Sequence, residues 1–257
     1  MPMSKKQIMA EILSQTSLAD GIYDMTLKAE EIAVQAKAGQ FISVYVNDKS
    51  KILPRPISIC EIDKEAGTLR IVYRVAGEGT TQLSSYEAGE RIKILGPLGN
   101  GFTQKKEKAI LIGGGIGIPP MLELAKQLSC EKTIVLGYRD SQMFLKDEFE
   151  SHGTVIVSTE DGSVGTRGNV IDAIKEQGVE GSIIYACGPT PMLRGIQAYA
   201  EEQGIEAQIS MEERMACGIG ACLACVCHSK DVDSHSHVHN KRVCKDGPVF
   251  DAREVEL

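Results

Sequence analysis

The sequence has no excess of basic residues and no long uninterrupted apolar run. Lys and Arg number 28 against 35 Asp and Glu, which gives a formal net charge of −7. Without a basic stripe, nucleic acid is not expected as a partner. The most apolar run, 109–124, is broken by glycines and prolines, so no membrane span is expected there. Residues 1–6 lack the apolar core of a signal peptide, and we therefore expect a cytoplasmic protein.

Aromatic residues are also scarce, at 5%, whereas cysteine is abundant, with eight in the chain. In a chain with no export signal, this number favours metal or redox chemistry over disulfides. The remaining composition, 42% hydrophobic and 25% charged, is typical of a soluble globular protein. A chain of 257 residues is near the length at which one core divides, so we expect two domains and a small cysteine-rich segment.

Four of the cysteines, Cys217, Cys222, Cys225 and Cys244, follow the pattern C-x4-C-x2-C with a distant fourth member. This is the plant-type ligand spacing of a [2Fe–2S] cluster. The two glycines in the first interval allow a tight loop whose N–H groups point at the sulfurs. A structural zinc site is the alternative, although its ligands usually come as two C-x2-C-like pairs. Cys227 breaks the spacing, and we interpret it as a bystander.

Residues 1–103 are predicted to form an antiparallel β-barrel. Short alternating segments are separated by turn residues at regular spacing, which is typical of such barrels. The strands are expected at Gln7–Ser14, Gly21–Lys28, Gln40–Val46, Pro56–Glu61, Thr68–Val75 and Arg91–Leu95, with one short helix at Thr80–Ser85.

Three motifs in this barrel combine cations, hydroxyls and glycines. They are Arg55, Pro56, Ile57 and Ser58 on one strand, Val72, Tyr73 and Arg74 on another, and Gly79 and Thr80 at a helix start. The fork of Arg55 suits a pyrophosphate, Ser58 suits a heterocycle along the strand, and Tyr73 offers a stacking face. A helix start also favours phosphate. Taken singly, each motif is better explained by a solvated strand or a capped turn, and it is their order before a nucleotide domain that favours a site.

Residues 104–210 are predicted to form a nucleotide-binding domain. Strands alternate with helices, which indicates a doubly wound parallel sheet with ligands at the carboxyl ends of its strands. The expected strands are Ala109–Ile112, Thr133–Tyr138, Thr154–Ser158, Ser182–Cys187 and Glu206–Ser210, and the expected helices are Met121–Leu128, Leu145–Glu150, Asn169–Glu176 and Pro191–Gln203.

A glycine-rich turn after the first of these strands is close to the dinucleotide fingerprint. Its candidate cofactor-binding residues are Gly113, Gly114, Gly115 and Gly117. Ile118 replaces the third glycine of the fingerprint, so the position between strand and helix is what supports the interpretation. A tight turn without a ligand is the alternative.

Further candidates follow later strands of the same domain. Asp140 is placed to receive ribose hydroxyls, which favours NAD, although Arg139 beside it leaves NADP open. Cys187 is the candidate catalytic residue, and Gly188 and Pro189, which form a sharp turn after it, are further candidate cofactor-binding residues. A buried structural cysteine is the alternative for Cys187.

The order of these motifs resembles a known family, and the resemblance covers nearly the whole chain. The motifs R-P-I-S, V-Y-R with G-E-G-T, G-G-G-I-G, C-G-P-T-P-M-L and C-G-I-G-A-C-L-A-C are similar to those of the electron-transfer subunits of NAD-dependent (class 1B) dihydroorotate dehydrogenases, within the ferredoxin–NADP reductase superfamily. The resemblance implies FAD on the barrel motifs, NAD in the middle domain and a [2Fe–2S] cluster on the four cysteines of residues 211–257.

The resemblance also implies a partner and a reaction. Electrons would pass from an FMN-containing catalytic subunit through the cluster and FAD to NAD+ while dihydroorotate becomes orotate in pyrimidine (UMP) biosynthesis. A heterotetramer of two subunits of each kind is expected. The departures are Cys227 and a histidine-rich loop, which we interpret as a solvated hairpin tip rather than a metal site. Its members are His228, His235, His237 and His239.

Two other functions stay open from the sequence. One is a homologous FAD and [2Fe–2S] subunit of a sulfide dehydrogenase, a hydrogenase or a bifurcating NADH/NADPH transhydrogenase. The other is a zinc-binding adaptor without enzymatic activity, because four thiolates also suit zinc.

Overall fold

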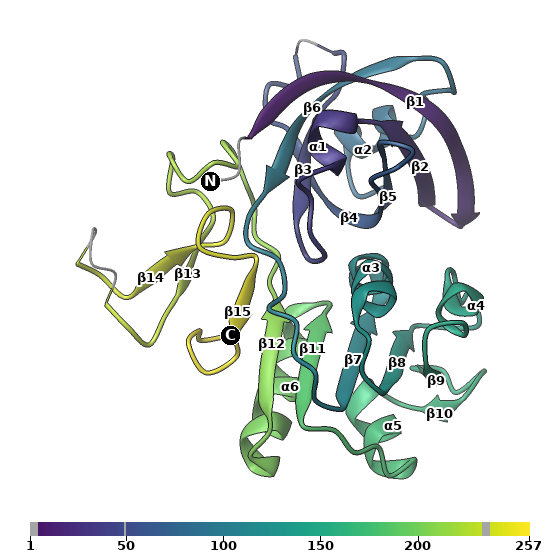
Figure 1. The fold of residues 1–257 in the computed structure, drawn as a ribbon, viewed down its shortest axis with the longest axis vertical. Coiled ribbons are helices and arrows are strands. Elements are labelled where there is room, and N and C mark those ends of the chain that lie inside the picture. Colours follow the sequence, from purple (N-terminus) through teal and green to yellow (C-terminus); the bar gives the residue numbers. More distant parts are fainter. Residues whose placement is uncertain (1–4, 49, 233–236) are drawn as a thin grey trace.

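The computed structural model describes residues 5–48, 50–232 and 237–257, which form two large domains and a smaller C-terminal segment (Figure 1). The first domain is a closed antiparallel barrel in the strand order β1-β2-β5-β4-β3-β6. Its elements are β1 (Lys6–Ala19), β2 (Ile22–Lys28), α1 (Glu30–Ala33), β3 (Phe41–Tyr45), β4 (Arg55–Asp63), β5 (Thr68–Arg74), α2 (Glu78–Leu83) and β6 (Arg91–Leu98).

Side chains on the barrel strands point alternately into the barrel and out of it. On β3, Ile42 and Val44 are fully buried in the barrel core, so the residue between them, Ser43, points outward. The same outward side carries Phe41, which packs with the second domain. The barrel therefore buries one set of strand residues in its own core and offers the other to its neighbours.

The second domain is a seven-stranded sheet in the order β10-β9-β8-β7-β11-β12-β15. All its strand pairs are parallel except β12 with β15. Its elements are β7 (Ala109–Gly114), η1 (Gly115–Gly117), α3 (Pro119–Gln127), β8 (Lys132–Tyr138), α4 (Lys146–Phe149), β9 (Thr154–Thr159), β10 (Thr166–Arg167), α5 (Val170–Glu176), β11 (Ile183–Cys187), α6 (Thr190–Gln203) and β12 (Glu206–Ser210).

Helices cover both faces of this sheet, as a doubly wound fold requires. Helices α5 and α6 pack together on one face, while α3 contacts β7 and β11 on the other. Helix α3 also packs against β4, so it lies between the sheet and the barrel (Figure 1). The expected combination of a flavin-type barrel with a doubly wound sheet is confirmed.

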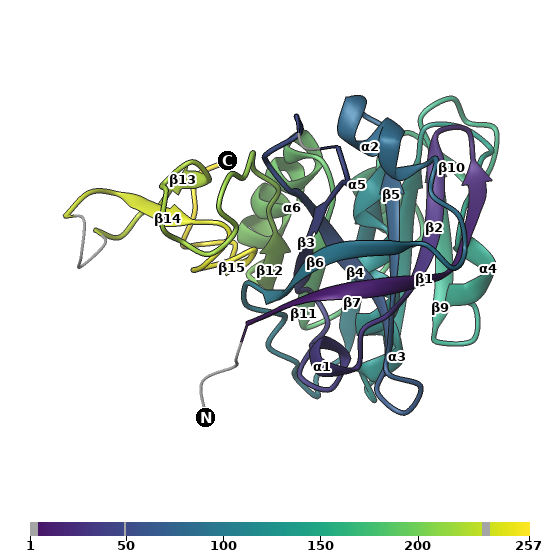
Figure 2. The ribbon, with the colours of Figure 1, turned by 90° about the horizontal axis from the view of Figure 1, so that it is seen from above.

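The C-terminal segment lies beside both domains and contains β13 (Val226–His228), β14 (Asn240–Arg242) and β15 (Val249–Asp251) (Figure 2). The first two strands form a hairpin, while β15 pairs antiparallel with β12 at the edge of the large sheet. The cluster loop, residues 217–225, precedes the hairpin. The segment is thus fixed to the second domain by backbone pairing.

Several short elements differ from expectation, among them α1, α2, β10 and the three strands of the C-terminal segment, which the sequence does not predict. The sequence predicts neither α1 nor β10, and α2 begins two residues before the predicted helix start. Within the part of the chain that the structure describes, no helix is both long and apolar enough to cross a membrane.

Candidate functional site

The cluster loop is shaped by two glycines whose backbone conformation is left-handed. Gly218 has φ +67° and Gly220 has φ +87°, values that disfavour any residue with a side chain. Two backbone nitrogens of the loop lie 3.4 and 3.3 Å from the Sγ of Cys217, and the nitrogen of Gly220 lies 3.1 Å from the Sγ of Cys244. The loop therefore directs N–H donors at sulfur, which is how a protein stabilises the negative charge of an iron–sulfur centre.

The four predicted ligands interact with one another, and Cys244 interacts with Cys217 as well as with Cys225. The side chains of Cys217 and Cys222 contact each other, as do those of Cys225 and Cys244. Across residues 5–48, 50–232 and 237–257, no three His, Cys, Asp or Glu side chains gather as a single metal ion would require. A tetrahedral zinc ion needs four ligands around one point, whereas each iron of a [2Fe–2S] core takes two thiolates. The four thiols supply the number of thiolates that a [2Fe–2S] core requires.

Ionisation of the thiols differs across the loop. Partial burial acts to raise the pKa of Cys217, but hydrogen bonds from the loop N–H groups and Cys222 outweigh it and bring the pKa to about 6. Burial, together with Cys225, raises the pKa of Cys244 to about 12. Because the thiolate is the metal-binding form, a cluster would bind Cys217 readily and displace a proton from Cys244.

The remaining cysteine and histidines of this segment have other contacts. The thiol of Cys227 donates to the carbonyl oxygen of Lys241 at 3.5 Å, within the hairpin. His239 Nδ1 lies 3.2 and 3.0 Å from two backbone carbonyl oxygens. His235 lies outside the described residues. The bystander role of Cys227 and the solvated histidine loop both stay predictions.

The strand that begins at Arg55 forms a cradle with the start of α2. A Cβ placed on Gly79 would lie 1.9 Å from Arg55 Nε, so the guanidinium occupies the space that any side chain there would fill. Thr80 Oγ1 accepts hydrogen bonds from the backbone just before α2, at 2.8 Å from the nitrogen of Ala76 and 3.1 Å from that of Gly77. The cradle is of the kind that suits a pyrophosphate, which makes these residues fit FAD.

The second barrel motif is divided between the interior and the surface. Tyr73 is 1% exposed, stacks on Tyr23 with ring centroids 5.9 Å apart, and donates its hydroxyl to Gln15 at 2.9 Å. The ring lies in the barrel core, and the stacking role expected from the sequence stays a prediction. Arg74 is exposed, and its Nη2 lies 3.6 Å from a Cβ placed on Gly115. Arg74 therefore reaches the glycine turn of the other domain.

The glycine turn packs closely against the turn that follows β11. A Cβ on Gly114 would lie 2.3 Å from the Sδ of Met192, and one on Gly117 would lie 2.4 Å from the carbonyl oxygen of Cys187. These glycines are required by packing within the protein. Gly115 differs, because it has φ +53° and only the Arg74 guanidinium nearby, so it is the position where a ligand can approach the backbone.

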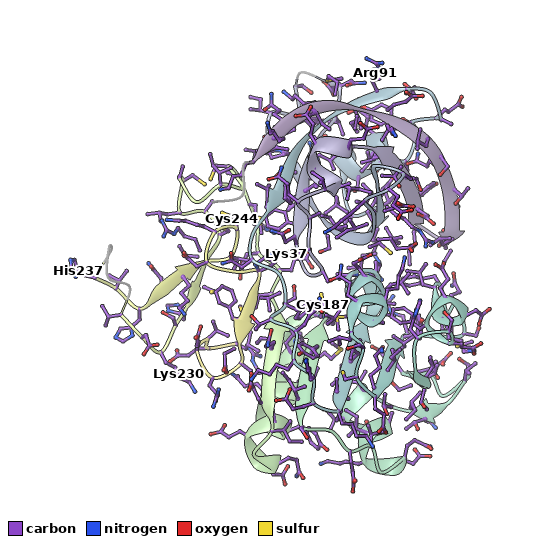
Figure 3. The ribbon with its side chains drawn as sticks, viewed as in Figure 1. Lys37, Arg91, Cys187, Lys230, His237 and Cys244 are labelled. Carbon is purple, nitrogen blue, oxygen red and sulfur yellow. The ribbon has the colours of Figure 1, made fainter. Side chains whose placement is uncertain are left out.

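Cys187 lies at the edge of the second domain that faces the barrel (Figure 3). Burial raises the pKa of its thiol to about 12, although Ser210 lowers it and Glu212 adds to the increase. The thiol is therefore neutral at pH 7, which suits hydrogen bonding or packing rather than nucleophilic attack. No local pattern marks Ser210 or Glu212 as neighbours of Cys187. They come beside Cys187 because β11 and β12 are parallel neighbours, with Cys187 opposite Ser210.

Asp140 follows β8 on the same rim. Its carboxylate accepts a hydrogen bond from the nitrogen of Gln142 at 2.8 Å. The nitrogen of Asp161, in the loop after β9, lies 3.3 Å from the carbonyl oxygen of Arg139. A backbone hydrogen bond thus joins the loops after β8 and β9 at Arg139, and the ribose-binding role of Asp140 stays a prediction.

Three family models together match most of the chain. An oxidoreductase FAD-binding domain matches residues 10–102 and an oxidoreductase NAD-binding domain matches residues 111–198. The iron–sulfur cluster binding domain of dihydroorotate dehydrogenase B matches residues 212–256. The protein is therefore an oxidoreductase chain with FAD, NAD and iron–sulfur binding domains.

Solved structures share this architecture. The structure reported as the NADH-dependent reduced ferredoxin–NADP oxidoreductase, in a study of flavin-based electron bifurcation, has a TM-score of 0.87 at 30% identity and covers 97% of this chain and 90% of its own. The ferredoxin reductase of carbazole 1,9a-dioxygenase has a TM-score of 0.69 at 16% identity and covers 80% of this chain and 68% of its own, which shows the fold alone.

Curated relatives extend the likeness over nearly full length. The dihydroorotate dehydrogenase B (NAD(+)) electron transfer subunit of Streptococcus mutans is 43% identical and covers 96% of both chains. That of Geobacillus thermodenitrificans is 41% identical and covers 96% of this chain and 97% of its own. The protein belongs to the family of dihydroorotate dehydrogenase B electron transfer subunits.

Proposed function

We propose that this chain carries electrons between an FMN-containing catalytic subunit and NAD+ while dihydroorotate is oxidised to orotate in pyrimidine (UMP) biosynthesis. Relatives at 41–43% identity bear the name of that electron transfer subunit. The observation that carries the proposal is that the three candidate sites adjoin one another. Arg74 of the barrel reaches Gly115 of the nucleotide domain, and Gly218 of the cluster loop covers Ser43 of the barrel.

The residues fit the three groups in distinct ways. Arg55 over Gly79 would hold the pyrophosphate of FAD, and Ser58 its heterocycle. Gly115 and Asp140 would receive NAD, and the four cysteines would hold the cluster. When bound, FAD exchanges electrons singly or in pairs, which suits a position between a one-electron cluster and a hydride carrier. The chain's own task is to hold the nicotinamide and flavin sites against each other and keep the cluster near the surface.

The partner is expected at the cluster loop. Cys222 is exposed and Leu223 is 54% exposed beside it, which supports contact with a second protein there. We propose a heterotetramer with two copies of this chain and two of the FMN-containing subunit, acting in the cytoplasm.

The test is a comparison of Cys222→Ala with the wild-type chain, each co-expressed with the FMN-containing subunit. Removing one thiolate should abolish the visible absorption and electron paramagnetic resonance of the cluster, together with dihydroorotate-dependent NAD+ reduction. Reduction of FAD by NADH in the same variant should persist, because its residues are separate. Cys227→Ala is the matched control, since Cys227 lies outside the four ligands, and it should retain both reactions.

Three results would contradict the proposal. The first is a wild-type chain that binds zinc and stays colourless after anaerobic reconstitution. The second is dihydroorotate oxidation by this chain without its partner. The third is loss of NADH-dependent flavin reduction in Cys222→Ala with FAD still bound. Titration with NADH and NADPH in parallel also measures the nucleotide preference that Asp140 predicts.

A second candidate function is favoured by one comparison. The structure at 30% identity is described as part of an NADH-dependent reduced ferredoxin–NADP oxidoreductase, so a homologous chain with a different partner shares this architecture. Capture of the FMN-containing subunit, with dihydroorotate-dependent NADH formation, supports the first candidate. Capture of a different redox partner with no such activity supports the second.

A further inference from the structure

A hydroxyl group is buried without a partner where the cluster loop meets the barrel. Ser43, on β3, is 1% exposed, and its Oγ forms no hydrogen bond within the described residues. Buried polar atoms are nearly always hydrogen-bonded, and one that is not destabilises the fold. The hydroxyl is therefore available to hydrogen-bond a ligand that binds beside it.

The surroundings of Ser43 show from which side that partner comes. The side chain points out of the barrel, because its neighbours Ile42 and Val44 fill the barrel core. A Cβ placed on Gly218 would lie 2.8 Å from Ser43 Oγ and 3.4 Å from the Cδ1 of Leu98. The cluster loop thus closes directly over the hydroxyl, at the residue that follows the first ligand.

The other side of Ser43 is the flavin strand. In the β3–β4 ladder Ser43 lies opposite Pro56, which adjoins Arg55. Ser43 is therefore one strand away from the predicted flavin-binding residues and in contact with the cluster loop. Ser43 therefore lies between the predicted flavin site and the cluster loop.

The hydrogen-bonding groups of the cluster loop indicate which atom would accept the hydrogen of the Ser43 hydroxyl. Two N–H groups of the loop are directed at the Cys217 sulfur, and Gly218, which covers Ser43, directly follows Cys217 in the chain. We propose that Ser43 donates its hydroxyl hydrogen to a sulfur at the Cys217 end of the bound cluster, and so acts as a positioning residue that raises the cluster's reduction potential. Hydrogen bonds to cluster sulfurs have this effect because they stabilise the added negative charge of the reduced state. The inference rests on the proposed function only in requiring the cluster.

The proposal predicts opposite effects in the two states of the protein. Without the cluster, the hydroxyl is unsatisfied, so Ser43→Ala should leave thermal unfolding unchanged or raise its midpoint. With the cluster bound, the same variant loses a hydrogen bond, so the cluster should have a lower reduction potential. It should also be lost to a chelator about fivefold faster, as expected for one hydrogen bond. If Ser43 had only a structural role, Ser43→Ala would have the same effect on stability with and without the cluster.

The experiment uses the full chain, reconstituted anaerobically with iron, sulfide and FAD, without the partner subunit. Cluster and flavin potentials are measured by redox titration monitored by electron paramagnetic resonance and absorption. Ser43→Thr, which keeps a hydroxyl on the same carbon, should restore the wild-type cluster potential. Ser158→Ala, which removes another buried unpartnered hydroxyl in the nucleotide domain, is the matched control and should leave the cluster potential unchanged.

Two outcomes overturn the proposal. One is an unchanged cluster potential in Ser43→Ala. The other is a shift confined to the flavin potential, which would assign the hydroxyl to FAD. Both leave the proposed function intact, because the cluster is then present. A wild-type chain that takes up no cluster overturns the proposed function as well, so the two failures are distinguishable.

Discussion

At the scale of single residues, the junction between the domains depends on a buried carboxylate. Glu123, on α3, is 4% exposed, and its Oε2 accepts a hydrogen bond from the nitrogen of Ile62 at 2.8 Å. Strand β3 pairs with β4 only through residues 55–58, so the nitrogen of Ile62 on that side has no strand partner. The nucleotide domain therefore satisfies a backbone donor of the barrel.

Glu123→Gln should stabilise the protein at neutral pH, on the order of 1 kcal/mol. Burial raises the pKa of Glu123 above its ordinary value of 4.5, so the folded state holds the proton more tightly than the unfolded state. The penalty is absent well below pH 4.5, grows as pH rises through the folded-state pKa, and is complete above it. Glutamine keeps the acceptor for Ile62, and the amides of Gln127 and Gln104 can reverse together to suit it. Urea unfolding of both proteins between pH 4 and 8 measures the gain.

The exposed Glu131→Gln is the control, and it should show no gain that rises with pH. A constant or negative difference for Glu123→Gln across this range would mean that the carboxylate charge itself holds the domains together.

The same scale shows what the sequence can and cannot predict about the site. Cysteine spacing predicts the interacting thiols because three of them share one short loop. The pattern around Tyr73 does not reveal the partner of its hydroxyl, because Gln15 is 58 residues away in the chain. Ser43 and Glu212 carry no local pattern at all. Their places follow from the order of strands, which the sequence does not state.

At the scale of elements, strand periodicity predicts most of the fold. It does not predict elements that are very short or that form only by pairing with a distant strand. The predicted limits of β12 agree with the structure, because that strand is buried throughout most of its length. Strand β1 runs to Ala19, five residues beyond its predicted end, because pairing with β2 extends through exposed residues. Helix α1 has four residues and β10 two, too few to show a period. Strand β15 is not predicted because it pairs with β12, which lies about 40 residues earlier in the chain.

The start of α2 gives the prediction at this scale. Gly79→Ala should fold normally but bind FAD about tenfold more weakly, because the new methyl group would displace the Arg55 guanidinium from its cradle. The fold should survive, since Arg55 is flexible and can swing toward solvent. Gly77→Ala is the matched control, because a Cβ there meets nothing within 4 Å. Fluorescence titration of the FAD-free chains measures both affinities, and equal weakening in the two variants would count against the cradle.

At the scale of the whole molecule, one arginine connects the barrel to the nucleotide domain. Arg70, on β5, has a side chain that is 17% exposed and contacts three carboxylates. Its Nη2 lies 2.7 Å from Asp24 Oδ2 within the barrel, and it also pairs with Glu61. Across the junction, Nη1 and Nη2 lie 2.6 and 2.9 Å from the two carboxylate oxygens of Glu148, on α4. This paired geometry fixes direction as well as distance.

Glu148→Gln should therefore slow the reduction of FAD by NADH several-fold, because a small change in domain orientation misplaces the reacting groups. Stability should fall by less than about 1 kcal/mol, since Glu148 is partly exposed and solvent screens the pair. FAD affinity and the cluster signal should stay unchanged, because their residues lie elsewhere. Glu150→Gln is the matched control, since Glu150 pairs with Lys146 inside its own domain. Stopped-flow measurement at low and high salt checks the effect: high salt should slow the wild type toward the variant, whereas equal rates throughout would mean that α3 alone sets the orientation of the two domains.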